Sequence, residues 1–443
     1  MDILIKVVQF FMSLSLLVII HELGHFLAAR MFGIRVEKFY LFFDPWFSIF
    51  KFRRGQTEYG MGWLPLGGYV KIAGMIDESM DTEQMAAEPQ PDEFRSKPAW
   101  QRLIVMVAGV VMNVVLAFVI YCGISYHWGE PYMPAEDAKW GYVWNKAGHE
   151  LGFEDGDKVL SIGGNQITEV DQILNELLIT ADDREVVVER AGAEHTFTIP
   201  LEQLVKMRQE EGYKNMYAMR MPFEIDSVAT DEAVAAGLVR GDRLVALNGE
   251  EVRYFDEYKQ LLPTLAGQSV KLGIERDSAN VVVAREVEIT LADDGTIGVL
   301  ARNPFEVRTR HYSFFESIPA GLRLTGEEIS GYWKQIKTIV VPESKLYEEL
   351  GGFLSIGNVF PDEWDWERFW RTTALLSVIL AVMNILPIPA LDGGHVLFLL
   401  WEVITRRKPS DKFLEYAQMF GLIVLFALLL YANGNDIYRL FIK

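Results

Sequence analysis

The sequence predicts a polytopic α-helical membrane protein with four transmembrane helices and a soluble, twice-repeated α+β region between the second and third helices. Half of the 443 residues are hydrophobic and the mean hydropathy is positive, which is high for a soluble protein. Apolar runs long enough to cross a bilayer occur near both ends of the chain. Residues 129–308 between them are acidic and contain an internal repeat. Together these observations favour membrane spans joined to soluble domains.

Charged loops bound the four predicted spans. The first covers residues 1–30, the second 103–126, the third 372–404 and the fourth 412–434. Basic residues cluster after the first span, before the second, and between the third and fourth. The positive-inside rule places these loops in the cytoplasm. Both termini and residues 129–308 are then expected in the periplasm of a Gram-negative cell, with the spans in its inner membrane.

Composition excludes several classes of protein. The formal net charge is −19, whereas a nucleic-acid partner would require a basic patch. Cys122 is the only cysteine, so an intrachain disulfide and a zinc site built from cysteines are both excluded.

The first span contains the motif His21-Glu22-Leu23-Gly24-His25 inside an apolar run. Histidines at positions i and i+4 lie on one face of a helix, so His21 and His25 can bind one metal ion. Glu22 then lies beside the metal, where a carboxylate can accept a proton from water. Ionisable groups at membrane depth are costly and indicate function. A core helix with two hydrogen-bonded histidines is the plainer alternative.

The third span supplies the rest of a ligand set. It contains Asn384, two prolines and two glycines around Asp392, followed by His395. Such a break in a membrane helix is tolerated where the freed backbone is buried in protein or lines a wet cavity. A zinc ion with two histidine ligands needs a third protein ligand, and Asp392 is the favoured residue. His395 is the alternative ligand, and Asp392 could instead cap the helix that follows it.

Residues 152–160 align with residues 237–245 at an offset of 85, and Gly164 aligns with Gly249. In the second copy the motif residues are Gly237, Leu238, Gly241 and Asp242. This pattern resembles PDZ domains and implies two tandem PDZ-like domains, residues 129–222 and 223–308. PDZ domains bind an extended chain by strand addition, so the motif marks a possible groove. Spacer domains, or a filter that excludes bulky substrates, are the alternatives.

The remaining segments connect these parts. Residues 31–102 form a basic cytoplasmic loop. Residues 309–345 have the apolar spacing of an amphipathic helix at a membrane interface. Residues 346–371 are a linker with tryptophans that are typical of an aromatic belt before the third span.

The two membrane motifs together resemble the signature of site-2 proteases, which are zinc intramembrane proteases, and the overall arrangement resembles their bacterial regulator-of-sigma-E branch. The resemblance implies one Zn²⁺ per chain, held by His21, His25 and Asp392, with Glu22 as the catalytic base. It also implies a membrane-associated β-hairpin at residues 60–72, whose edge pairs with substrate. The residues that it implies for substrate binding are Asn384, Pro387, Pro65, Gly67, Gly68 and Tyr69.

The expected activity is hydrolysis of peptide bonds within the membrane in single-span proteins. By resemblance the substrates would be an anti-sigma factor already cut in the periplasm and signal-peptide remnants, with membrane lipid as a further partner. The sequence departs from the family pattern at residues 42–45, 108–113 and 350–354. Asn113 could contact substrate or pack between helices. A binding protein with a vestigial metal site and a transporter are the rival functions.

Overall fold

A computed structural model describes residues 2–75, 88–278 and 281–442. The chain divides into two compact units. One contains Met1–Glu130 and Arg310–Lys443, and the other contains Pro131–Thr309. The first unit holds the predicted spans and the second holds the predicted repeat.

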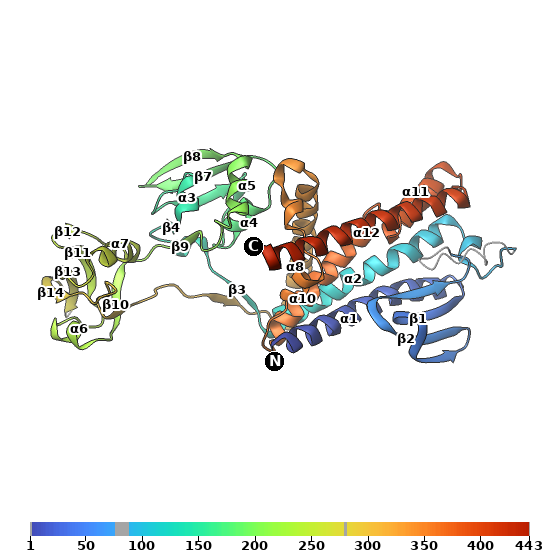
Figure 1. Ribbon diagram of the computed structural model, residues 1–443, viewed down its shortest axis with the longest axis horizontal. Coiled ribbons are helices and arrows are strands. Elements are labelled where there is room, and N and C mark those ends of the chain that lie inside the picture. Colours follow the sequence, from blue (N-terminus) through green and yellow to red (C-terminus); the bar gives the residue numbers. More distant parts are fainter. Residues whose placement is uncertain (1, 76–87, 279–280, 443) are drawn as a thin grey trace. The chain divides into compact units, whose positions relative to one another are not determined.

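Long helices dominate the first unit (Figure 1). They are α1 (Asp2–Met31), α2 (Ala99–His127), α8 (Phe314–Val340), α10 (Trp366–Ile385), α11 (Asp392–Thr405) and α12 (Asp411–Ile442), with a short α9 (Phe353–Asn358). Among the described residues, three stretches are long and apolar enough to cross a membrane: Ile3–Met31, Ala99–His127 and Lys412–Arg439. The predicted third span is present as α10 and α11 with an interruption between them. A membrane protein with β domains is therefore confirmed, and the count of four spans stays a prediction.

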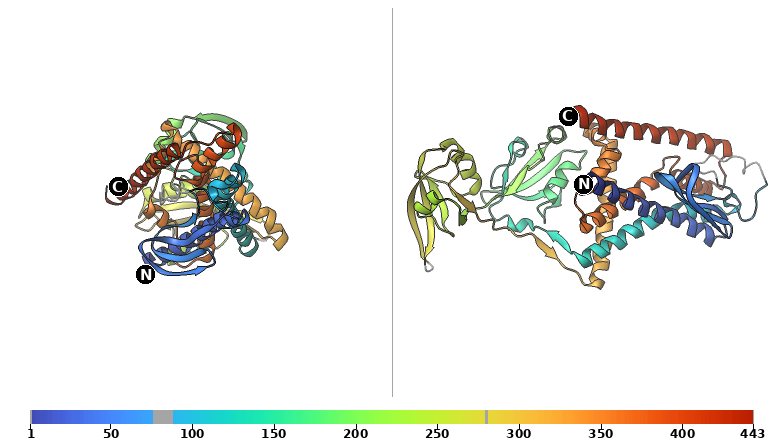
Figure 2. Two further views of the ribbon diagram at one scale, coloured as in Figure 1. Left: turned by 90° about the vertical axis from the view of Figure 1, so that its right-hand side faces the viewer. Right: turned by 60° about the horizontal axis from the view of Figure 1, so that its bottom comes forward.

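A β-hairpin follows α1. Its antiparallel strands are β1 (Val36–Arg54) and β2 (Thr57–Ile72), so the hairpin is longer than the predicted residues 60–72. The register shifts around Phe43 and Ser48, where β1 is distorted, and Phe42 and Trp46 have left-handed φ angles of 65° and 72°. Figures 1 and 2 show the hairpin at the end of this unit that is opposite to the start of α1 and the end of α12.

Two apolar clusters hold the helices and the hairpin together. One joins α1, the hairpin, α2 and α11, and its buried members are Ala28, Ala29, Ile34, Val36, Val70, Ile72, Phe94, Val105, Met106 and Leu399. The other joins α2, α8 and α10 around Ala117, Ile120, Tyr121, Ile124, Ala374, Val378 and Val382. Because α2 contributes to both clusters, it is the central packing element of this unit.

The second unit contains two similar sets of elements. The first set has β4 (Tyr142–Trp144), α3 (Lys146–Glu150), β5 (Lys158–Ile162), β6 (Asn165–Gln166), α4 (Gln172–Leu178), β7 (Arg184–Arg190), β8 (Ala193–Ile199), α5 (Leu201–Gln209) and β9 (Tyr217–Met219). The second has β10 (Phe223–Val228), α6 (Asp231–Ala235), β11 (Arg243–Leu247), β12 (Glu250–Glu251), α7 (Phe255–Leu261), β13 (Ser269–Ser278), β14 (Val281–Thr290) and β15 (Val299–Ala301). Two further strands, β3 (Glu130–Tyr132) and β16 (Arg308–Arg310), pair with each other.

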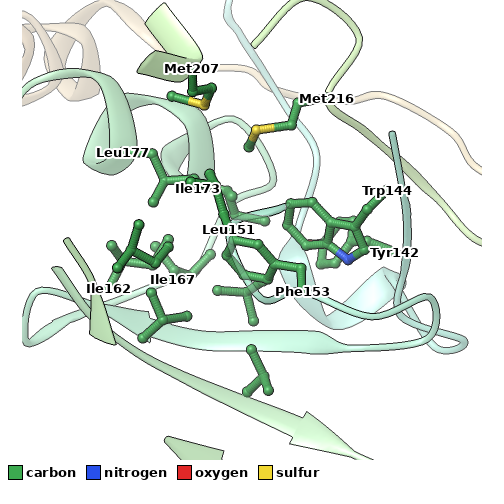
Figure 3. Packing of buried hydrophobic residues seen from close by; sticks show 14 of the residues in the cluster. Tyr142, Trp144, Leu151, Phe153, Ile162, Ile167, Ile173, Leu177, Met207 and Met216 are labelled. Carbon is green, nitrogen blue, oxygen red and sulfur yellow. The ribbon is translucent and has the colours of Figure 1, made fainter. Parts of the chain in front are cut away.

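The offset of 85 residues is visible in the elements themselves: α3 matches α6, and β5 matches β11, residue for residue. The first sheet has the order β6-β5-β7-β8, and the second has β14-β13-β11-β10-β15 with β12 beside β11. Each copy has its own apolar core, and Figure 3 shows the first, in which Trp144 stacks on Phe153 with ring centroids 3.9 Å apart. The repeat is therefore structural, while its relation to PDZ domains stays a prediction.

The aspartate of each repeat motif supports the fold of its loop. Asp242 is fully buried, accepts hydrogen bonds from Val239 N and from the Arg276 guanidinium, and Arg276 also donates to Gly237 O at 2.8 Å. Hydrogen bonding to this carboxylate raises the pKa of Arg276. In the first copy Asp157 and Arg190 make the equivalent pair.

The other motif residues of the second copy are also placed by the fold. Leu238 belongs to the apolar core, and Gly237 and Gly241 adopt left-handed φ angles of 81° and 89°. The observed contacts of Leu238 and Asp242 are thus structural, and the groove role of this motif stays a prediction.

Candidate metal centre

The site begins on α1, where two histidines face the same way. The helix is unbroken from Asp2 to Met31, which places His21 and His25 one turn apart. Their Nε2 atoms are 3.2 Å from each other. Both residues are buried, with 9% and 7% of their surface exposed.

Asp392 reaches this pair from the interrupted span. The helix α10 ends at Ile385, and two prolines, which lack an N–H, prevent it from continuing. Ala390 has a left-handed φ of 77°, and Asp392 is the first residue of α11. Its Oδ2 atom lies 3.2 Å from His21 Nε2 and 3.3 Å from His25 Nε2. The break therefore converts a distant carboxylate into a neighbour of the two histidines.

These three atoms have the spacing of metal ligands. They form a nearly equilateral triangle with edges of 3.2, 3.2 and 3.3 Å. Ligand atoms about 2.0–2.1 Å from a tetrahedral zinc ion lie about 3.3 Å apart. Asp392 Oδ2 is buried without a hydrogen-bond partner, as expected for an atom that binds a cation. These three residues thus fit a zinc ion. Among the described residues, they are the group of possible metal ligands whose atoms lie close enough together to share one ion.

The ring orientation of His25 also fits metal binding. Its Nδ1–H donates to the backbone oxygen of Val105 on α2 at 2.8 Å. This hydrogen bond leaves the lone pair of Nε2 free to bind a metal, and such a second contact is usual for metal-binding histidines.

A cavity of about 860 Å³ opens onto the triangle. Glu22, Asn384, Gly67, Gly68 and Tyr69 line it together with the three candidate ligands. The Asn384 side-chain nitrogen is 3.4 Å from His21 Nε2. The cavity therefore brings most of the residues predicted from sequence to one place.

A model of "Peptidase family M50" matches residues 9–428, nearly the whole chain. The chain belongs to peptidase family M50. Three relatives are each 28% identical to it. They are "Putative zinc metalloprotease" of Vibrio cholerae (99% of this chain and 100% of the relative), "Protease RseP" of Yersinia pestis (99% and 100%), and "Regulator of sigma E protease" of Haemophilus influenzae (98% and 98%). The predicted family and the prediction of a metalloprotease are confirmed.

Three predicted residues of this M50 peptidase lie away from the triangle. Pro65 and Pro387 are outside the lining of the cavity. His395 lines the cavity, but its Nε2 atom lies 2.7 Å from the side-chain nitrogen of Gln418 on α12 and does not join the triangle. The geometry thus favours Asp392 over His395 as the third ligand.

In the hairpin of this M50 peptidase, the predicted residue Tyr69 pairs with Asp44, a cavity residue that the sequence did not single out. Tyr69 donates to Asp44 Oδ1 at 2.9 Å, and Ser48 donates to Asp44 Oδ2 at 2.9 Å. Burial and the adjacent Asp44 carboxylate raise the pKa of Tyr69, so its hydroxyl stays a donor. Asp44 lies in residues 42–45, one of the stretches that depart from the family pattern. This departure is the sequence signal that could have identified Asp44.

Close helix contact at the site depends on two glycines that sequence reasoning did not interpret. A Cβ on Gly109 of α2 would lie 2.4 Å from His25 Nε2, and one on Gly24 of α1 would lie 2.4 Å from Ala108 O. Neither position has room for a side chain. The M50 site is therefore built against α2 as well as within α1.

Proposed function

We propose that this chain is a zinc-dependent endopeptidase that cuts single-span membrane proteins within the bilayer. The observation that carries the proposal is the ligand triangle of His21, His25 and Asp392, two of whose members lie on a helix long and apolar enough to cross a membrane. Zinc agrees with the triangle's dimensions and with the name of the Vibrio cholerae relative.

Each residue of the site then has a distinct task. A zinc ion held by the triangle would supply Lewis-acid activation of water and of the scissile carbonyl. Glu22 follows the first ligand directly and lines the cavity, where it accepts the proton of the attacking water and delivers it to the leaving nitrogen. The Asn384 amide donates a hydrogen bond to the substrate backbone.

The hairpin can bind a substrate segment in an extended conformation. A helical substrate hides its carbonyls in hydrogen bonds, so it must become extended before attack. The strand β2 belongs to a two-stranded sheet, and Gly67, Gly68 and Tyr69 line the cavity. A substrate segment that pairs with the edge of β2 is held extended beside Glu22.

The names of two relatives and the charge pattern support the proposed substrates and location. The proposed substrates are an anti-sigma factor already cut in the periplasm and signal-peptide remnants; the names "Protease RseP" and "Regulator of sigma E protease" of two relatives support a link to sigma-factor control. We place the chain in the bacterial inner membrane with both termini and the repeats in the periplasm. Lipid covers the exposed apolar residues of α1, α2 and α12. No nucleic acid takes part.

Substitution of Glu22 tests this function. Glu22→Gln should keep one zinc per chain, because the triangle is intact, and should lower cleavage of a reconstituted single-span substrate by about 10²–10⁴-fold. Zinc is measured by elemental analysis and cleavage by gel mobility of the substrate. Wild-type protein treated with a chelator and reloaded with zinc is the control. Cleavage by Glu22→Gln at the wild-type rate would exclude Glu22 as the base, and active protein without metal would exclude the zinc mechanism.

A further inference from the structure

The surroundings of Asn113 on α2 differ from those expected of a residue that contacts substrate. It is fully buried, and it does not line the cavity. Its side-chain Nδ2 atom lies 3.0 Å from His21 Nδ1, and its Oδ1 atom is buried without a partner. Its backbone oxygen accepts a hydrogen bond from Ser377 of α10 at 2.8 Å. The side chain therefore contacts His21 and lies outside the cavity lining.

The chemistry of His21 dictates what its partner must be. A neutral imidazole that binds metal through Nε2 carries its proton on Nδ1, so the atom facing Nδ1 must accept a hydrogen bond. His25 meets this condition through Val105 O. For His21 the acceptor must come from Asn113, the residue at Nδ1.

The Asn113 amide can supply an acceptor because its two ends have the same shape. Rotation by 180° about the Cβ–Cγ bond exchanges Oδ1 and Nδ2. In the orientation with Nδ2 towards the ring, Oδ1 is buried without a partner, and rotation would place this oxygen at His21 Nδ1. The proton on His21 Nδ1 decides, and it selects the orientation with Oδ1 towards the ring.

We propose that Asn113 is a positioning residue for the metal, whose Oδ1 accepts the His21 Nδ1 proton and orients the ring so that Nε2 points at the metal. Val105, Gly109 and Asn113 follow one another at intervals of four and so share one face of α2. The first and last hold the two rings, and Gly109 between them leaves room for both. One face of α2 is thus a template for the pair of histidines. The proposal rests on the proposed ligand set.

The test measures zinc affinity of the full-length protein in detergent by competition with a chelator. Asn113→Leu keeps the size of the side chain and removes its polar atoms, and it should lower zinc affinity by about 10–100-fold. Asn113→Asp keeps an acceptor and should stay within about threefold of wild type, because a carboxylate is a usual partner of a metal-bound histidine. Ser377→Ala is the matched control, since it removes a contact to the Asn113 backbone only.

Several results would overturn the proposal. Wild-type affinity in Asn113→Leu would do so, and so would a loss in Asn113→Asp as large as in Asn113→Leu, because aspartate cannot donate as Nδ2 would. The absorption spectrum of the Co²⁺-loaded Asn113→Asp protein should match the wild-type spectrum, so the test survives if Asn113→Leu does not fold. His21→Ala distinguishes an error in the proposed ligand set from an error in the positioning role of Asn113. If it retains zinc, the ligand set is wrong; if only Asn113→Leu retains zinc, the positioning role alone is wrong.

Discussion

The two halves of the metal centre are held in different ways. The α1 half is an unbroken helix whose two histidine rings each have a second contact on α2. The α10–α11 half is a break followed by Asp392, whose Oδ2 atom has no hydrogen bond and whose side chain is 15% exposed, against 11% for His21 and 9% for His25. The two rings of the first half are thus held by contacts to α2, whereas in the second half Asp392 Oδ2 lies at ligand spacing but has no hydrogen-bond partner.

This difference has a physical cause in the backbone. In the α1 half, intrahelical hydrogen bonds and close packing against α2 hold the two histidines in place. In the other half, the prolines remove backbone donors and Ala390 has an unfavourable left-handed φ. The break has turn hydrogen bonds, such as Ile388 N to Leu386 O at 2.7 Å, in place of a helical ladder. A segment of this kind opens more easily than a packed helix. Substrate access is therefore expected from the α10–α11 side.

The largest expected effect comes from disturbing the rigid half. In Gly109→Ala the new Cβ would lie 2.4 Å from His25 Nε2 and 2.8 Å from His21 Cε1. Both rings would have to move, so zinc affinity should fall by at least about 100-fold and cleavage should be lost. Zinc content and cleavage of a reconstituted substrate measure the effect.

Gly123 provides the control on the same helix. A Cβ there would meet nothing within 4 Å, so Gly123→Ala should keep zinc and activity. Zinc binding by Gly109→Ala that equals that of Gly123→Ala would show that the histidines are not held tightly against α2.

Removal of the metal should distinguish the halves directly. After chelation, amide hydrogen exchange should rise by about 10-fold or more across residues 386–394, because bound metal stabilises the state that it binds. Residues 17–28 of α1 should change little, since helix packing holds them. Mass spectrometry of peptides from both regions measures this, and zinc re-addition is the control. Equal increases in the two regions would remove the distinction drawn between them.

The sequence predicts the candidate ligands of both halves, but it does not predict the contacts that hold them, because these come from residues far away in the chain. His21 and His25 follow from helix periodicity, and the break before Asp392 follows from proline and glycine chemistry, so both sets of ligands could be proposed. The acceptor for His25 is a backbone oxygen 80 residues away, and a backbone atom leaves no signature in sequence. Likewise the family resemblance implied a hairpin at residues 60–72, but its full length depends on pairing with β1.

The smallest expected effect concerns an ion pair between α2 and α11 that is far from the candidate ligands. Arg102 at the start of α2 donates to Glu402 in the last part of α11 at 2.5 Å, with side chains 9% and 17% exposed. Glu402 is ten residues from Asp392, about 15 Å along a helix. Glu402→Gln should therefore leave zinc content unchanged and lower cleavage by less than about threefold.

Glu402→Gln should lower the free energy of unfolding, because the substitution removes the carboxylate that pairs with Arg102. The expected coupling energy between Arg102→Gln and Glu402→Gln is about 1–3 kcal/mol, between the values typical of exposed and of buried ion pairs. A double-mutant cycle of unfolding in mixed micelles measures it. Loss of zinc in Glu402→Gln would mean that the far end of α11 controls where Asp392 lies, and the second half of the site would then be held by protein after all.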